Sequence, residues 1–233
     1  EGKAKYALGS VLGHVLLHQT INGNEAILQM EQAGDYPDII VGCTGGGSNL
    51  AGLMFPFLGQ QLRGGQKIDI IGCEPLSCPS FTKGKYAYDH GDMARMTPLI
   101  KMHTLGSDFL PPANHSGGLR YHGMSYHLSH LYDLGLMRAK AYGQKDCFEA
   151  GVLFGKQEGI IPAPEGNHAV KGAIDAALEC KEKGESKTIL FNLCGHGHFD
   201  MTAYDDYFSG RLADDFYDED SANQSLASLP EIG

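Results

Sequence analysis

The chain has 233 residues, of which 42% are hydrophobic and 20% charged, and it contains 32 glycines, a composition typical of a globular protein. Its net charge of −10 argues against binding to nucleic acid or to anionic membranes, because both attract basic surfaces. The six cysteines lack the dense spacing of a secreted disulfide scaffold, and no apolar run approaches the roughly 20 residues that span a bilayer. These features favour a soluble, cytoplasmic protein.

Hydrophobic periodicity predicts alternating helices and strands along most of the chain. In chain order, we expect a helix over residues 10–33, a strand over 38–43, a helix over 49–62, a strand over 68–73, helices over 145–157 and 166–183, and a strand over 187–193. The first two strands flank a glycine-rich turn and a helix, which is the order of a βαβ unit. The pattern therefore predicts an α/β fold with a doubly wound, mostly parallel sheet.

Two regions lack this periodicity. Residues 74–136 carry repeated proline and glycine turn signals, and a long irregular stretch inside a compact domain is more often functional than idle. Residues 209–233 are acidic and rich in small side chains, so we expect a frayed C-terminal tail there. The predicted division is an α/β portion over residues 1–208 followed by this tail.

Three consecutive glycines lie between Thr44 and Asn49, directly after a predicted strand and at the start of a predicted helix. Glycines allow close backbone approach, several N–H groups can converge on one anion, and the positive helix end adds attraction. The segment lacks the lysine of a nucleoside triphosphate loop and the spacing of a dinucleotide loop. A monophosphate is the expected ligand, and a tight turn without a ligand is the alternative.

This glycine segment resembles the loop that binds the phosphate of pyridoxal 5'-phosphate (PLP) in the tryptophan synthase beta-chain family, whose members are fold-type-II PLP enzymes. Further segments agree in order and spacing with the second branch of that family: residues 6–10 (YALGS), 117–123 (GGLRYHG), 158–165 (EGIIPAPE) and 192–200 (NLCGHGHFD). The likeness covers nearly all of residues 6–208. It implies a partial fold-type-II enzyme in which residues 1–208 form the cofactor-phosphate-binding portion.

The resemblance implies a role for each matching residue. Ser10 would lie beside the cofactor ring, Glu165 near its phenolic oxygen, and Gly195 in the loop around the ring. Taken alone, Glu165 could equally be an ordinary acid in the first turn of a helix. The cofactor phosphate would be held by Gly45, Gly46, Gly47, Ser48 and Asn49.

Cys194 departs from the family pattern, because it stands where the family usually has a serine facing the pyridine nitrogen. A thiol is a weak donor, but a neutral partner still leaves the ring nitrogen largely unprotonated. This favours loss of a β-substituent over racemisation or transamination. The alternative interpretation is a small buried residue at the end of a strand.

Arg120 is a second departure, at a position where the main branch has an aspartate. An arginine would bind a phosphorylated leaving group, as in O-phosphoserine, or pair with a structural acid. The histidine pairs His127/His130 and His196/His198 raise the alternative of a metal site. We expect no metal, because no cysteine or carboxylate recurs nearby at ligand spacing.

In the family, the Schiff-base lysine lies in an N-terminal half, and no lysine here has a comparable His-Lys-x-Asn setting. We therefore expect part of a PLP-dependent carbon–oxygen lyase of tryptophan biosynthesis, which joins serine or O-phosphoserine to indole in the complete protein. The alternative is a non-catalytic phosphate- or PLP-binding module, or a half-enzyme acting with a separate N-terminal chain. The face that meets the missing half should be apolar, so we expect a homo-oligomer or such a partner.

Overall fold

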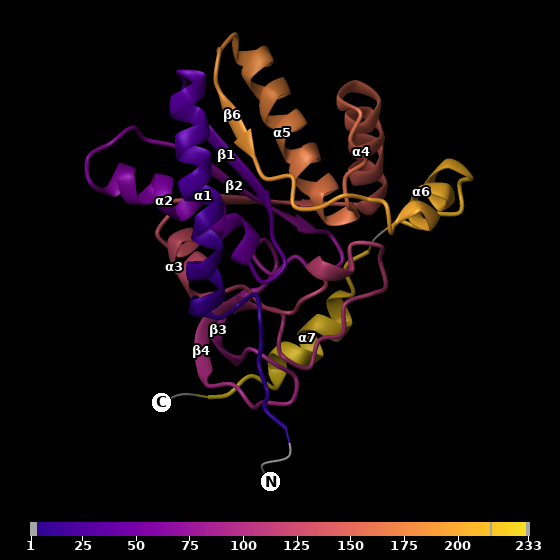
Figure 1. Cartoon of the computed structure of the whole chain (residues 1–233). Helices are drawn as coiled ribbons and strands as arrows, with labels where there is room; N and C mark the ends of the chain where they lie inside the picture. Colours follow the sequence, from indigo (N-terminus) through magenta and orange to yellow (C-terminus); the bar gives the residue numbers. More distant parts are fainter. Residues whose placement is uncertain (1–3, 215, 232–233) are drawn as a thin grey trace.

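The computed structural model describes residues 4–214 and 216–231. Its centre is a parallel sheet with the strand order β5-β2-β1-β6. The strands are β1 (Ile39–Cys43), β2 (Asp69–Pro75), β5 (Arg138–Tyr142) and β6 (Ile189–Phe191). Figure 1 shows helices on both sides of this sheet. The predicted doubly wound, mostly parallel fold is therefore confirmed.

Helices cover both faces of the sheet because successive side chains of a strand point to opposite faces. Ile40 and Ile70 pack in one apolar cluster with residues of α2 (Ser48–Leu62). Val41 and Ile71 pack in a second cluster with residues of α5 (Pro164–Lys183). Burial of both faces explains the nearly continuous apolar runs that identify these strands in the sequence.

Helix α1 (Gly13–Ala33) packs against α2, and the backbones of the two helices come close together where glycines meet. A Cβ atom on Gly23 would lie 2.6 Å from the carbonyl oxygen of Gly52, and one on Gly52 would lie 2.5 Å from that of Gln19. The outer face of α1 is mixed: Leu17, Ile21 and Leu28 are exposed by 69%, 60% and 63%, and polar residues such as His18 and Glu25 are exposed beside them. Three large apolar side chains of α1 are therefore open to solvent, and the expected contact with a partner or a second copy stays a prediction.

Residues 74–136, expected to be irregular, contain several short elements. They are the antiparallel strands β3 (Lys85–His90) and β4 (Leu99–Thr104), the 3-10 turn η1 (Gly117–Leu119) and helix α3 (Tyr126–Asp133). Two further helices follow this region in addition to α5: α4 (Gln144–Glu158) and α6 (Met201–Phe208). In the part of the chain that the structure describes, no helix is both long and apolar enough to cross a membrane.

The expectation of a frayed tail needs correction for the described residues after 215. They contain helix α7 (Glu219–Ala227), which begins where the Asp218 side chain accepts a hydrogen bond from the backbone N–H of Ser221 at 3.0 Å. Ala222 is fully buried in a cluster that includes Leu105 and Phe109. Tertiary packing against the excursion between β2 and α3 therefore orders this acidic segment, which has little apolar sequence of its own.

Candidate cofactor site

The glycine loop, residues 44–49, joins β1 to α2 at the carboxyl edge of the sheet, and residues 44–48 are buried. Within the described chain, no backbone hydrogen bond is made by the N–H groups of residues 45–49. The first turn of α2 contains no acidic residue. Because buried N–H groups are almost always paired, such a cluster of free donors at a positive helix end is suited to an anion.

The three glycines of the loop are enclosed so closely that a side chain larger than hydrogen would not fit at any of them. A Cβ atom on Gly45 would lie 2.8 Å from the Cα atom of Leu119. A Cβ atom on Gly46 would collide with the hydroxyl of Ser10 and lie 3.0 Å from the Ser10 backbone carbon. Gly47 has a φ of +97°, a left-handed conformation that favours glycine. The structure therefore brings Ser10 and η1 against the glycine loop.

Two buried hydroxyls at the site have no hydrogen-bond partner among the described residues: Thr44 Oγ1 within the loop and Ser125 Oγ beside it. Ser125 also donates its backbone N–H to the carbonyl oxygen of Gly46 at 3.0 Å, which holds it against the loop. An unsatisfied buried hydroxyl is costly, and a ligand oxygen at the loop would satisfy it. Sequence reasoning missed Ser125 because it lies far along the chain and carries no motif.

Replacing Ser125 with alanine should weaken binding of phosphate and PLP by about tenfold, because a hydrogen bond to a charged group contributes roughly 1.5 kcal/mol. Isothermal titration calorimetry measures the change. Ser225→Ala is the matched control, since Ser225 Oγ is also buried and unpaired but belongs to α7. Equal affinities of the two variants would exclude Ser125 from the site.

The other end of the loop is connected to the segment after β6. The amide oxygen Asn49 Oδ1 accepts a hydrogen bond from Asn192 Nδ2 at 3.1 Å and a longer one from Cys43 Sγ at 3.9 Å. The sulfur atoms of Cys43 and Cys194 lie 3.3 Å apart. Cys194 is thus tied to the loop through Cys43, a residue to which sequence reasoning assigned no role.

The two thiols of this pair differ in acidity. The hydrogen bond from Cys43 lowers the pKa of Cys194 below its ordinary value, although burial and the charge of Glu165 act in the opposite direction. The pKa of Cys43 is raised well above its usual range, first by the hydrogen bond with Cys194 and then by burial. These directions favour ionisation of Cys194 before Cys43, and the single proton of Cys43 can then be donated either to Asn49 Oδ1 or to the Cys194 sulfur.

Glu165 lies in the first turn of α5, where its Oε1 atom accepts the backbone N–H of Gly118 at 2.8 Å. The carbonyl oxygen of Gly118 would lie 2.9 Å from a Cβ atom on Gly45, so η1 links Glu165 to the glycine loop. Gly195 has a φ of +147°, and its carbonyl accepts the N–H of Ala163 just before α5. The residues predicted to surround the cofactor therefore converge, and their roles remain predictions.

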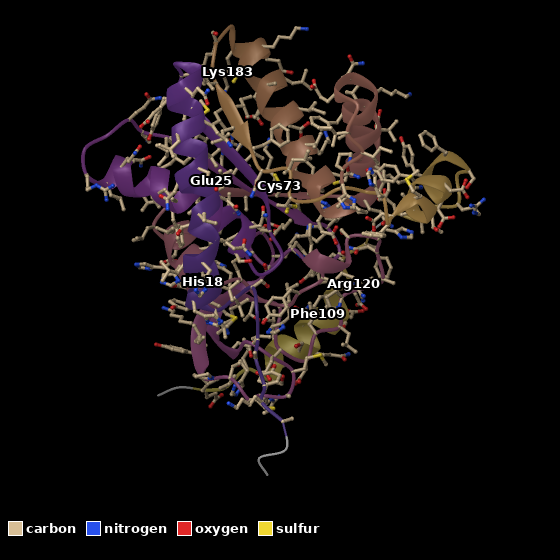
Figure 2. The ribbon with its side chains drawn as sticks, in the orientation of Figure 1. His18, Glu25, Cys73, Phe109, Arg120 and Lys183 are labelled. Atoms are coloured by element: carbon tan, nitrogen blue, oxygen red, sulfur yellow. The ribbon has the colours of Figure 1, made fainter. Side chains whose placement is uncertain are left out.

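Arg120 is exposed and directs its guanidinium to its own segment. Its Nε atom donates to the carbonyl of Pro112 at 2.9 Å and a terminal nitrogen donates to that of Pro111 at 2.6 Å. Figure 2 shows Arg120 near Phe109, and both line a hollow of about 500 Å³. The recorded partners are carbonyl groups rather than the structural acid considered from the sequence, and its substrate role remains a prediction.

The rings of His196 and His198 lie 4.5 Å apart, and the His198 N–H donates to His196 Nδ1 at 3.2 Å. Across residues 4–214 and 216–231, no three histidine, cysteine or carboxylate side chains are grouped as metal ligands would be. The two histidines are exposed beside the Cys194 segment, and the His196 ring also lies 5.5 Å from the ring of Phe199.

Residues 15–195 match the family model described as "Pyridoxal-phosphate dependent enzyme". The chain belongs to this family. It is 58% identical over 208 residues to "Tryptophan synthase beta chain 2" of Methanosarcina mazei, covering 89% of this chain and 47% of that protein. It is 59% identical over 213 residues to the protein of the same name from Aquifex aeolicus, with 90% and 49% covered. The resemblance seen in the sequence is thereby confirmed, and the chain spans about half the length of these curated relatives.

The fold is similar to that of a fungal L-serine ammonia-lyase from Rhizomucor miehei, with a TM-score of 0.60. The sequence identity is 14%, and the match covers 85% of this chain and 57% of that one. At this identity the likeness concerns the fold alone.

Proposed function

We propose that this chain is the cofactor-phosphate half of a PLP-dependent lyase that forms tryptophan from indole and either serine or O-phosphoserine. The observation that carries the proposal is the set of free N–H groups in the glycine loop, which is connected through short contacts to both Cys194 and Glu165. Any helix start leaves its first N–H groups without intrahelical partners, but here residues 44–48 are buried away from water and the buried hydroxyl of Ser125 is unpaired as well.

The residues present fit PLP. The N–H groups of Gly45 to Asn49 would hold its phosphate, and Ser10 would lie beside its ring. Cys194 would face the ring nitrogen as a weakly acidic partner, and Glu165 would lie near the phenolic oxygen. When bound, PLP supplies an electron-withdrawing ring that stabilises negative charge on the substrate's α-carbon.

Substrate and partner contacts complete the proposal. Arg120 would bind the phosphate of O-phosphoserine through the guanidinium N–H groups that do not already donate to the carbonyls of Pro111 and Pro112. The exposed Leu17, Ile21 and Leu28 side chains of α1 would contact the half that carries the lysine, or a second copy of the chain. A cytoplasmic location is part of the same proposal.

The test has two parts. The chain itself should bind PLP and inorganic phosphate in calorimetric titrations. A longer protein that carries both halves of the relatives' length should form tryptophan from indole and serine or O-phosphoserine. PLP binding without product in the longer protein would favour the alternative of a non-catalytic binding module, and absence of binding would refute both.

Cys194 has a specific test in that longer protein. Cys194→Ser should retain the replacement reaction, because serine is also a neutral partner for the ring nitrogen. Cys194→Asp should divert a large share of turnover to racemisation or transamination, because a carboxylate keeps the ring nitrogen protonated. Chromatography of the products measures the partition. If the aspartate variant yields the wild-type product ratio, Cys194 does not face the ring.

A further inference from the structure

Cys43 and Cys194 come from segments far apart in the sequence but adjacent in the sheet. Cys43 ends β1, and Cys194 follows β6, which pairs with β1 in parallel register. Their sulfur atoms are 3.3 Å apart. A disulfide needs about 2.05 Å between the two sulfur atoms. Only a small approach of the two thiols is therefore required.

We propose that Cys43 and Cys194 are a redox-modification site, at which a low-molecular-weight disulfide such as oxidised glutathione converts the thiol pair into an intramolecular disulfide.

The two thiols are suited to different steps of this conversion. In the chain by itself, Cys194 is partly exposed and lines a hollow of about 670 Å³ between α1 and β6, so a small oxidant can reach it. Its lowered pKa increases the thiolate fraction, and the thiolate is the attacking species. Cys43 is buried behind it and serves as the resolving thiol. Exposure and acidity thus select the same residue for the first attack.

The exchange is balanced in atoms and electrons. Cys194 thiolate attacks one sulfur of oxidised glutathione, a Cys194–glutathione bond forms, and the first glutathione leaves as a thiolate. Cys43 then loses its proton to that thiolate or to solvent and attacks Cys194 Sγ, which releases the second glutathione. The two protein thiols lose two electrons in total, and one glutathione disulfide is reduced to two thiols.

The first step removes the main obstacle to the second. The largest cause of the raised pKa of Cys43 is its hydrogen bond with Cys194, and the charge of Cys194 adds to it. Both contributions end when Cys194 becomes part of a neutral mixed disulfide. Cys43 then ionises more readily, with its target sulfur already adjacent.

Cys73 is the nearest competing thiol on the sheet, because it pairs with Cys43 in the register of β1 and β2. It is buried, and desolvation raises its pKa to about 12. A protonated thiol without access to the oxidant reacts slowly. The pair of Cys43 and Cys194 should therefore be oxidised selectively.

The test is incubation of the folded chain with oxidised glutathione, followed by thiol blocking, digestion without reductant and peptide mass analysis. The wild-type chain should lose two hydrogen atoms and yield one cross-linked peptide pair containing Cys43 and Cys194, and dithiothreitol should reverse the change. Cys43→Ser should stop at glutathione on Cys194, and Cys194→Ser should remain unmodified. The matched control Cys73→Ser should still form the cross-link.

The wild-type result decides the matter even if a variant folds poorly. A stable glutathione adduct on Cys194 without the cross-link, a cross-link between other cysteines, or no reaction would each overturn the proposal. The bridge is measured without PLP and is independent of the proposed function. Its consequence for the cofactor site, the loss of the free Cys194 thiol, does rest on that function.

Discussion

Replacing Gly46 with aspartate should lower the affinity of the chain for phosphate and PLP by on the order of 100-fold or more, which corresponds to about 2.7 kcal/mol. Two effects act together. The new Cβ atom would collide with Ser10, and the new carboxylate would place negative charge beside the N–H groups that face the anion. Isothermal titration with PLP and with inorganic phosphate measures the loss.

Gly59→Asp is the matched control for this substitution. Gly59 lies near the other end of α2, and a Cβ atom there would be 3.4 Å from a guanidinium nitrogen of Arg63, with which the new acid can pair. This variant adds the same charge and should bind both ligands as the wild type does. Circular dichroism establishes that both variants are folded. If folded Gly46→Asp binds as tightly as the control, the loop is only a turn.

The chain alone should form no stoichiometric lysine adduct with PLP and should make no tryptophan. An adduct needs an amine held at the cofactor aldehyde and partly desolvated, so that it is deprotonated near neutral pH. Lys140 and Lys171 pair with carboxylates of α5, and Lys101 lies 4.5 Å from the centre of the Tyr86 ring. These contacts keep the three lysine amines away from the glycine loop, so none of them is expected to react with the cofactor aldehyde.

Phosphate contacts should persist without the adduct, because the glycine loop is local to one βαβ unit. Treating the chain with PLP, reducing it with borohydride and measuring its intact mass separates the two effects. Scattered, substoichiometric labelling is the expected result. A single stoichiometric site, mapped by peptide analysis and removed by replacing that lysine with arginine, would show that a lysine of this chain has taken the catalytic role.

The elements that the sequence predicts correctly are those with a strong local pattern. Strands β1 and β2 are nearly continuous apolar runs because both their faces are buried, and α5 begins with proline and ends before a glycine. Strand β5 is not an apolar run, because it contains Arg138 and Lys140. In the folded chain Arg138 pairs with Asp69 and Lys140 pairs with Glu179. These charged side chains find their partners only when β5 packs beside β2 and α5, so the local sequence does not predict the strand.

The acidic C-terminal segment shows the same dependence on tertiary structure. Its composition predicts a frayed end, yet Ala222 is buried and Ser225 lies so close to Gly106 that a Cβ atom there would be 2.7 Å from the Ser225 backbone carbon. The short helix gains this burial from residues between β4 and η1. The buried side chain of α7 in this cluster is an alanine, and so small an apolar residue does not predict burial from the sequence.

By itself, the sequence determined the glycine loop, its position between a strand and a helix, and the family resemblance, because a phosphate loop depends on consecutive residues and backbone N–H groups. Only the tertiary structure decided which distant side chains meet that loop. It placed Ser125 against Gly46 and Cys43 against Cys194, and it turned Arg120 toward two carbonyl groups. Such contacts depend on how parallel strands and their connections pack, and that information is spread over the whole chain rather than held in any motif.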